Sequence, residues 1–506
     1  MIVKHRYWLL LFVIIKFVLQ YYVNGNDHYE LHRDEFLHLD QAKHLAWGYH
    51  SVPPFTSWLS WIILQLGNGV FWVKFFPALF GTLTIILVWR IVEDLNGTVY
   101  AAALAAVRLI FSSLLRLNML FQPNSPDIFF WTSLIYSIFK FIQTANPRWI
   151  YLSAISFALG FLNKYNIAFC LAGLMPVLLF SGHNTIFKSK HFYIATFLAL
   201  ILIAPNLMWQ YQNNFPVIAH MQELRETQLL KVPRINFLME QISLFSGGLI
   251  LIGAALVSFF IYPAFRKYKF LAYSYVLTLL IFIFLRAKGY YAYGLYPILF
   301  AFGAVYWVRL FSKRKGWLHL PLIMISIMFI PLYNRAFPIK KPEAFFDSDK
   351  DNKQISKHTW EDGTEHLIPQ DFADMLAWKE LANKVKAVYA SLPDRNSTLI
   401  IADNYGQAGA INYYSGMETD AVSFNADYIN WFHLEQPIKN VVYVITKGDR
   451  MPAKLLLLFQ HIDYKAEIKN PFAREYGSKI YVLSDPKVDL RPILRKQLNQ
   501  LGAVFQ

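Results

Sequence analysis

Long apolar runs alternate with short polar breaks over the first two thirds of the chain. A run of about 20 apolar residues is long enough to cross a bilayer as a helix. Eleven runs are predicted to do so, near 7–23, 69–89, 97–115, 126–142, 149–163, 165–182, 191–209, 243–263, 270–285, 290–311 and 317–333. The pattern predicts a polytopic α-helical membrane domain over residues 1–335.

The composition fits this prediction, since 56% of the 506 residues are hydrophobic and only 16% are charged. A net charge of +15 is also typical of proteins that bind nucleic acid. The basic residues, however, form small clusters between the apolar runs, where topology signals lie, so no nucleic-acid partner is expected. The single cysteine, Cys170, lies within an apolar run and excludes an intrachain disulfide and a cysteine metal cluster.

The loop charges predict the orientation. If the N-terminus is cytoplasmic, every second loop is short and basic, as at Lys188 and Lys190, and the positive-inside rule is satisfied. The opposite loops, near 24–68, 116–125, 210–242 and 286–289, are longer on average and mix acidic with basic residues. The first run resembles a signal peptide, but no small-residue cleavage site follows Tyr22, so a retained span is expected. An odd number of spans then places the C-terminal part outside the cytoplasm.

Polar and charged residues become frequent from about 334. Strand-like runs at 399–401, 441–445 and 480–483 alternate with helix-like stretches such as 371–391. Residues 336–506 are therefore predicted to form a soluble extracytoplasmic α/β domain.

The first external loop, 24–68, carries the acidic pair Asp34 and Glu35. Apolar residues recur after it at helical spacing up to Tyr49, which predicts an amphipathic helix at the membrane surface. Neighbouring residues on a helix point about 100° apart, so the two carboxylates cannot serve one reacting atom. We expect one to act and the other to support it. The alternative is that both only stabilise the positive end of the helix dipole.

A second acidic residue, Asp127, is predicted at the external mouth of the span at 126–142. An ionisable residue there is costly unless it is paired or functional. It can instead cap its helix, although Ser125 is also available for that.

Cations and tyrosines lie together in a short external loop that contains Arg286, Lys288, Tyr290 and Tyr291, and Lys164 occupies another external turn. Such a combination suits a lipid phosphate. The alternative is an ordinary aromatic belt with cations that extend to the interface.

Histidines are numerous near the N-terminus, and a metal site at His32, Asp34, Glu35 and His38 is one interpretation. Their spacing matches no sharp metal signature.

The pattern Asp34-Glu35-Phe36, with 44–49 and Pro53-Pro54 after it, resembles the GT-C class of membrane glycosyltransferases. It is similar to the bacterial family-39 type, which includes relatives of protein O-mannosyltransferases and of the lipid A aminoarabinose transferase. The likeness continues at 124–127, 163–165, 205–210, 288–291 and 403–408, and so covers nearly the whole chain. It departs from the family at 37–38, where relatives often carry aromatic residues, and at 51–52, where they carry an acidic residue before the prolines.

The resemblance implies a polyprenyl-phosphate-sugar donor and a lipid, glycan or protein acceptor, with transfer on the extracytoplasmic face of a bacterial plasma membrane. It implies Asp34 as the general base on an acceptor hydroxyl. A phosphate leaves as a stable anion, so one base and cations for the phosphate suffice.

The remaining roles follow the same resemblance. Glu35 and Asp127 take supporting or metal-binding roles. The resemblance leaves open whether a divalent metal ion is needed; if one is bound, Asp34 and Asp127 are its expected ligands. The cations and tyrosines at 286–291, together with Lys164, bind the carrier phosphate.

Two other classes of function stay open. A transporter would use intramembrane charges such as Lys16, Lys74 and Arg108 along a substrate path. The chain shows no inverted repeat, however, and its first external loop is long and acidic. A non-catalytic assembly factor with the same fold is the other alternative, against which the carboxylates at 34 and 127 argue.

Overall fold

The computed structural model describes residues 2–227, 229, 233–244, 248–311, 337–344, 358–361 and 363–502. The chain divides into two compact units. The helical unit comprises Met1–Gly25, Ala46–Thr56 and Phe71–Phe337, and the α/β unit comprises Asn26–Leu45, Ser57–Val70 and Pro338–Gln506. We expected the loop at 24–68 to belong with the transmembrane domain. Most of it lies instead in the α/β unit, because Phe36 is fully buried there against Trp378 and Tyr414.

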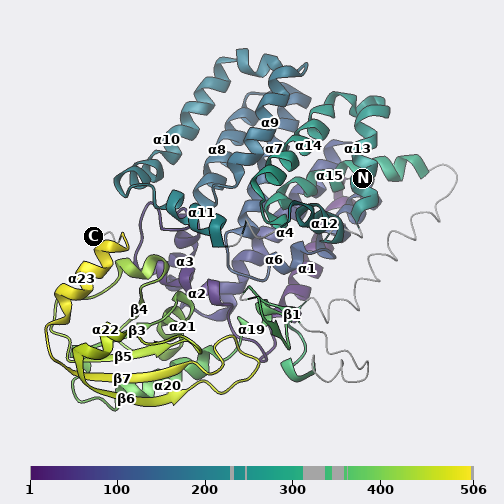
Figure 1. Ribbon diagram of the computed structural model, residues 1–506. Helices are drawn as coiled ribbons and strands as arrows, with labels where there is room; N and C mark the ends of the chain where they lie inside the picture. Colours follow the sequence, from purple (N-terminus) through teal and green to yellow (C-terminus); the bar gives the residue numbers. More distant parts are fainter. Residues whose placement is uncertain are drawn as a thin grey trace. The chain divides into compact units, whose positions relative to one another are not determined.

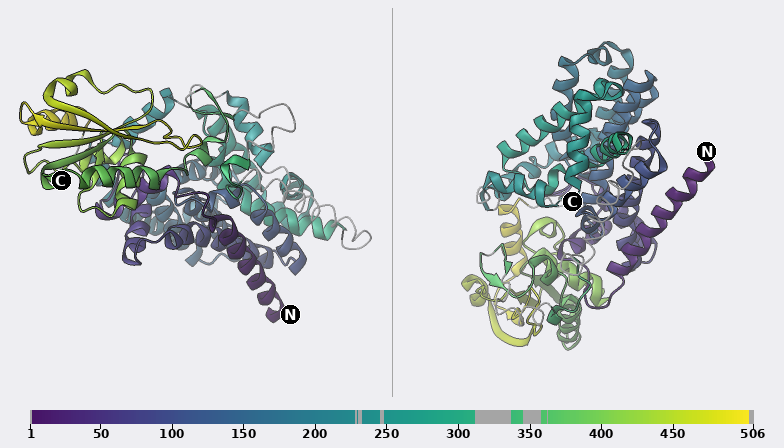
Figure 2. Two further views of the ribbon diagram at one scale, coloured as in Figure 1. Left: turned by 90° about the horizontal axis from the view of Figure 1, so that it is seen from below. Right: turned by 90° about the vertical axis from the view of Figure 1, so that its right-hand side faces the viewer.

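The helical unit is a bundle in which α8 packs between α7 and α10, α14 packs on α9, and α15 contacts both α5 and α13 (Figure 1). Helix α1 runs along the outside of this unit (Figure 2). The helices are α1 (Ile2–Asn24), α4 (Val70–Asp94), α5 (Val99–Ile110), α6 (Leu114–Leu117), α7 (Asn124–Thr144), α8 (Arg148–Asn163), α9 (Ile167–Phe180), α10 (Lys190–Gln212), α11 (Pro216–Thr227), α12 (Arg234–Leu244), α13 (Leu249–Ile261), α14 (Lys269–Leu285) and α15 (Tyr296–Phe311). Short 3-10 helices in this unit are η2 (Asn184–Lys188), η5 (Pro263–Tyr268) and η6 (Gly289–Leu295).

Within the described residues, five helical segments are long and apolar enough to cross a membrane: Arg6–Asn24, Val70–Asp94, Lys190–Gln212, Pro263–Phe284 and Gly289–Phe311. Helix α10 exposes Ile194, Phe197 and Leu200, whereas most of α15 is buried. Exposed apolar faces of this kind are stable in lipid rather than in water. The predicted span at 317–333 lies outside the described residues, so the number eleven stays a prediction.

The α/β unit contains a five-stranded mixed sheet in the order β4 (Ala421–Ser423), β3 (Thr398–Ala402), β5 (Asn440–Ile445), β7 (Lys479–Pro486) and β6 (Phe459–Glu467). Strand β3 is parallel to both β4 and β5, and β7 is antiparallel to both β5 and β6. The strand-like runs in the sequence coincide with β3, β5 and β7. Strand β5 is buried along its whole length, which explains its continuous apolar run. A separate hairpin pairs β1 (His358–Thr359) with β2 (Glu365–His366).

Helices cover both faces of the sheet. On one face, Leu399 and Val441 pack with Leu494 of α23 (Leu490–Gln500). Helices α20 (Trp378–Ala390) and α21 (Tyr405–Ser415) pack together and contact β5 and β3, and α2 (Arg33–Asp40) packs on α21. The remaining elements are α3 (Phe55–Gln65), α19 (Gln370–Ala373), η8 (Arg395–Ser397), η9 (Ala426–Asn430) and α22 (Ala453–Leu458).

Helix α2 is shorter than the predicted amphipathic helix and gives way to a 3-10 turn, η1 (Gln41–Lys43). Side chains at the C-terminal end of α2 bind partners in the α/β unit: Tyr428 donates a hydrogen bond to Asp40, and Gln41 donates one to Asp427. Residues Glu35 to Asp40 are all buried. The prediction of an interfacial helix was therefore wrong: α2 is a packed element of the α/β unit.

Candidate active site and metal-binding group

Asp34 lies in the first turn of α2 beside the first residue of α21. The Tyr405 hydroxyl donates a hydrogen bond of 2.6 Å to Asp34 Oδ1. Tyr405 is held in place because Asn404 caps α21, accepting a hydrogen bond from the backbone N–H of Gln407. The Arg33 guanidinium stacks 4.3 Å from the centroid of the Tyr405 ring. The Asp34 side chain keeps 40% of its surface exposed, so a fixed carboxylate remains accessible.

The charges around Asp34 favour its ionised form. His32 Nδ1 lies 3.9 Å from Asp34 Oδ2, and His32 Nε2 lies 3.9 Å from Asp374 Oδ2. Burial by itself would raise the pKa of Asp34, but His32, the Tyr405 hydroxyl and Arg33 together outweigh it and hold the pKa below its usual value. The group is therefore a carboxylate at neutral pH and can accept a proton.

Glu35 has a different local role from its neighbour. Its Oε2 accepts a 2.7 Å hydrogen bond from the backbone N–H of His32, while the His32 ring accepts one from the Asp34 N–H. This reciprocal pair is a capping box at the start of α2. For Glu35 this is the helix-start role of the alternative interpretation, and its supporting role in catalysis stays a prediction.

Asp127 is buried in the first turn of α7, within the helical unit. Its Oδ2 accepts a 2.9 Å hydrogen bond from Asn166 Nδ2. The same amide nitrogen lies 2.9 Å from the carbonyl oxygen of Tyr291, to which it also donates. The structure thus joins the segments at 124–127 and 163–166 to the loop at 286–291.

Lys164 is at the centre of this cluster. Its Nζ donates a 2.8 Å hydrogen bond to Asn124 Oδ1 and lies 4.5 Å from the centroid of the Tyr291 ring and 5.0 Å from that of Tyr290. Burial lowers the pKa of this loop lysine to about 8; the charge of Lys288 also lowers it, while Asp127 raises it. We call Asn124, Asp127, Lys164, Asn166, Lys288, Tyr290 and Tyr291 the lysine cluster.

The loop that carries Lys288 is anchored on α12. The backbone N–H of Gly289 donates a 2.9 Å hydrogen bond to Glu240 Oε2, and its carbonyl accepts one of 2.9 Å from Gln241 Nε2. A side chain at 289 would collide with Glu240, because a Cβ would lie 2.1 Å from its Oε2. Arg286 ends α14 in the left-handed conformation, with φ at 55°. Its predicted role in phosphate binding stays a prediction.

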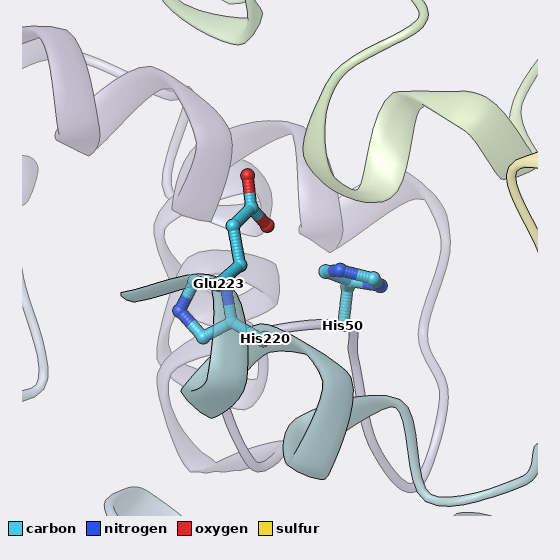
Figure 3. A group of neighbouring side chains, drawn as sticks. All are labelled: His50, His220 and Glu223. Atoms are coloured by element: carbon cyan, nitrogen blue, oxygen red, sulfur yellow. The ribbon is translucent and has the colours of Figure 1, made fainter. Parts of the chain in front are cut away.

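A third group of side chains has the geometry of metal ligands. His220 and Glu223 lie one turn apart on α11, and His50 comes from the segment before α3 (Figure 3). One ligand atom from each of the three lies within 4.8 Å of the others. Two imidazoles and a carboxylate are a donor set typical of zinc, and three protein ligands leave a coordination position open. The residues present therefore fit a divalent ion.

Other residues were expected from the sequence as metal ligands. The structure describes His32, Asp34, Glu35 and His38 but brings no such ligand group together from them. Asp34 and Asp127 belong to different units. A usable signal for the observed group was present in the sequence, since His220 and Glu223 have the i, i+3 spacing that shares a helix face.

The segment before His50 is held against α10, whose end leads into α11. Asn206 Nδ2 donates a 2.7 Å hydrogen bond to the carbonyl oxygen of Trp47. A Cβ on Gly48 would lie 2.4 Å from the Trp209 ring, so this close approach requires glycine. The anchoring brings His50 beside α11.

The chain is similar in sequence and in fold to known proteins. Residues 51–209 match the family model described as dolichyl-phosphate-mannose-protein mannosyltransferase. The structure of ArnT from Cupriavidus metallidurans bound to undecaprenyl phosphate superimposes with a TM-score of 0.63 at 13% identity, over 95% of this chain and 99% of that one. The chain has the GT-C fold. The apo structure of the same ArnT gives a TM-score of 0.58 at 12% identity, again over 95% and 99% of the two chains.

A curated relative, the lipid A galacturonosyltransferase RgtD of Rhizobium johnstonii, is 21% identical over 194 residues, which are 37% of this chain and 41% of that protein. The chain thus spans less than half the length of this relative. Together with the apolar helices, these findings confirm the predicted resemblance to the GT-C class of membrane glycosyltransferases.

Proposed function

We propose that this GT-C chain transfers a sugar from a polyprenyl-phosphate-sugar donor to a lipid, glycan or protein acceptor on the extracytoplasmic face of the bacterial plasma membrane. The observation that carries this proposal is the Asp34 carboxylate, which is ionised, accessible and oriented by Tyr405. The names of two similar proteins support the substrate class, because RgtD acts on lipid A and ArnT was crystallised with undecaprenyl phosphate.

In this proposal Asp34 acts as the general base. A carboxylate oxygen of Asp34 accepts the proton of the acceptor hydroxyl, and the resulting nucleophilic oxygen forms a bond to the anomeric carbon of the donor. The bond from that carbon to the phosphate oxygen breaks, and the polyprenyl phosphate leaves as an anion. Because Tyr405 and His32 stabilise the carboxylate, Asp34 is ionised before the acceptor arrives.

We propose a separate role for the lysine cluster, which belongs to the helical unit. Lys164 lies beside the Tyr291 ring in a partly buried environment, where charge interacts more strongly than in water, and Lys288 is close enough to lower its pKa. We assign them to the carrier phosphate, which gains negative charge as the sugar departs. Asp127 orients Asn166 and, through it, the loop at Tyr291.

The metal group adds a third element. A divalent ion at His50, His220 and Glu223 would join the segment at 46–56 to α11 and would supply a local positive charge.

The test is sugar transfer by the purified protein in lipid, with a panel of radiolabelled polyprenyl-phosphate sugars and a membrane extract as acceptor. Wild type is compared with Asp34→Asn and with Asp463→Asn, an exposed carboxylate on β6. We expect transfer by wild type and by Asp463→Asn, and its loss in a folded Asp34→Asn. Absence of transfer from every donor, together with solute uptake into vesicles, would favour a transporter.

A further inference from the structure

Lys16 is a buried lysine in α1, a helix apolar enough to cross the membrane. An ammonium in such a place is costly and is retained where it has partners or a function. Its Nζ donates hydrogen bonds of 2.9 Å to Asn118 Oδ1 and 3.0 Å to Gln20 Oε1. Both acceptors are neutral amides. These contacts therefore orient polar groups rather than pair two charges.

The hydrogen bonds continue from Asn118 in one direction. Asn118 Nδ2 donates a 2.7 Å hydrogen bond to Ser125 Oγ, and Ser125 Oγ donates one of 3.1 Å to the carbonyl oxygen of Leu117. Because a lysine can only donate, it selects the amide orientation in which Asn118 presents its oxygen to Lys16 and its NH₂ group to Ser125. Consecutive donors polarise one another in a buried chain, so each bond strengthens the next.

This series of hydrogen bonds includes Ser125 of α7, the helix that carries part of the lysine cluster. Ser125 lies in the first turn of α7, between Asn124 and Asp127. The same turn is attached from the other side, where Asn163 Nδ2 donates a 2.8 Å hydrogen bond to the carbonyl oxygen of Pro123. The first turn of α7 is thus held between α1 and the C-terminal end of α8.

We propose that Lys16 is a positioning residue for the lysine cluster. Through Asn118 and Ser125 it fixes the first turn of α7, so that Asn124 and Asp127 meet Lys164 and Asn166 in the observed geometry. This role rests on the proposed function, in which the lysine cluster binds the carrier phosphate.

The packing around Asn118 allows a second way to disturb the chain. A Cβ on Gly81 of α4 would lie 2.3 Å from Asn118 Oδ1 and 2.9 Å from its Nδ2. Gly81→Ala must therefore displace an amide that is bound at both ends. Its effect is expected to match that of Lys16→Met.

The experiment is a double-mutant cycle on transfer kinetics in lipid, with Lys16→Met, Ser125→Ala and the double variant. We expect each single variant to lose about tenfold in kcat, since small displacements of positioned groups carry losses of this order or larger. The double variant should fall little below the lower single variant, because both changes break one chain. Thr84→Val, near Lys16 in the same cavity, is the matched control and should keep the wild-type rate.

Binding of undecaprenyl phosphate in nanodiscs, measured without turnover, separates this inference from the proposed function. Weakened binding in Lys16→Met supports positioning even if no acceptor is found. Wild-type kinetics and binding in Lys16→Met, or losses that multiply in the double variant, would overturn it. A wild type that neither binds the carrier nor transfers sugar would overturn the proposed function and the positioning role with it.

Discussion

Removal of the Tyr405 hydroxyl tests the environment of Asp34 most directly. Tyr405→Phe keeps the ring on which Arg33 stacks and deletes only the donor to Asp34 Oδ1. A hydrogen bond to a charged group contributes about 1.5–3 kcal/mol. Because 40% of the Asp34 side chain is exposed, we reduce this to about 1–2 kcal/mol to allow for solvent screening. That energy corresponds to a factor of about 5–30 in the equilibrium between the carboxylate and the protonated acid.

The sign follows from which form the tyrosine binds. The hydroxyl stabilises the carboxylate, so its loss raises the pKa of Asp34 and extends the protonated, inactive form to higher pH. In acid, where Asp34 is mostly protonated, kcat/KM of Tyr405→Phe should fall by about 5–30-fold relative to wild type. Above the pKa of the variant the two enzymes should converge.

The assay is kcat/KM for transfer as a function of pH, from the acidic limb to neutrality, with the unfolding temperature measured in parallel. Tyr389→Phe is the matched control, because its hydroxyl donates to the carbonyl oxygen of Arg395 within the same unit. An acidic limb that does not move in Tyr405→Phe would show that the Tyr405 hydroxyl does not set the pKa of Asp34. An equal loss at every pH with a lowered unfolding temperature would show a structural defect instead.

Three further outcomes are expected. Burial raises the pKa of Asp40 to about 7, against hydrogen bonds that lower it. Because this pKa is higher in the folded than in the unfolded state, protonated Asp40 stabilises the fold at pH values below its unfolded-state pKa, and this stabilisation is lost as the pH rises toward 7. Asp40→Asn should therefore flatten the fall in the free energy of unfolding over this pH range. Zinc should raise the unfolding temperature of wild type and of His461→Ala but not of His50→Ala, and an equal shift in all three would exclude the metal group. A membrane-impermeant thiol reagent should label Lys386→Cys but not Lys188→Cys in intact spheroplasts; the reverse pattern would invert the predicted topology.

Local patterns in the sequence were enough to predict much of the secondary structure. The runs at 399–401, 441–445 and 480–483 lie in β3, β5 and β7, because a strand that is buried on both faces has apolar residues in succession. Apolar runs likewise marked helices such as α4 and α10, because bilayer thickness sets both length and composition. Asp34, Lys164 and Tyr291 were also singled out from the sequence, because an acidic pair in an external loop and cations beside tyrosines are candidate chemistry and because these segments resemble the GT-C class.

Tertiary structure decided which of these residues meet. Tyr405 lies 371 positions from Asp34, and nothing local to either residue encodes their hydrogen bond. His50 reaches His220 only because Asn206 and Gly48 hold its segment against α10. The end of α2 at Asp40 was not predictable for the same reason: its side chains bind partners from the C-terminal part of the chain, and this outweighs the helical spacing that continues to Tyr49. Sequence periodicity predicts the local backbone conformation and whether a face meets water, lipid or the core. A site, in contrast, is formed by contacts between segments that only the fold brings together.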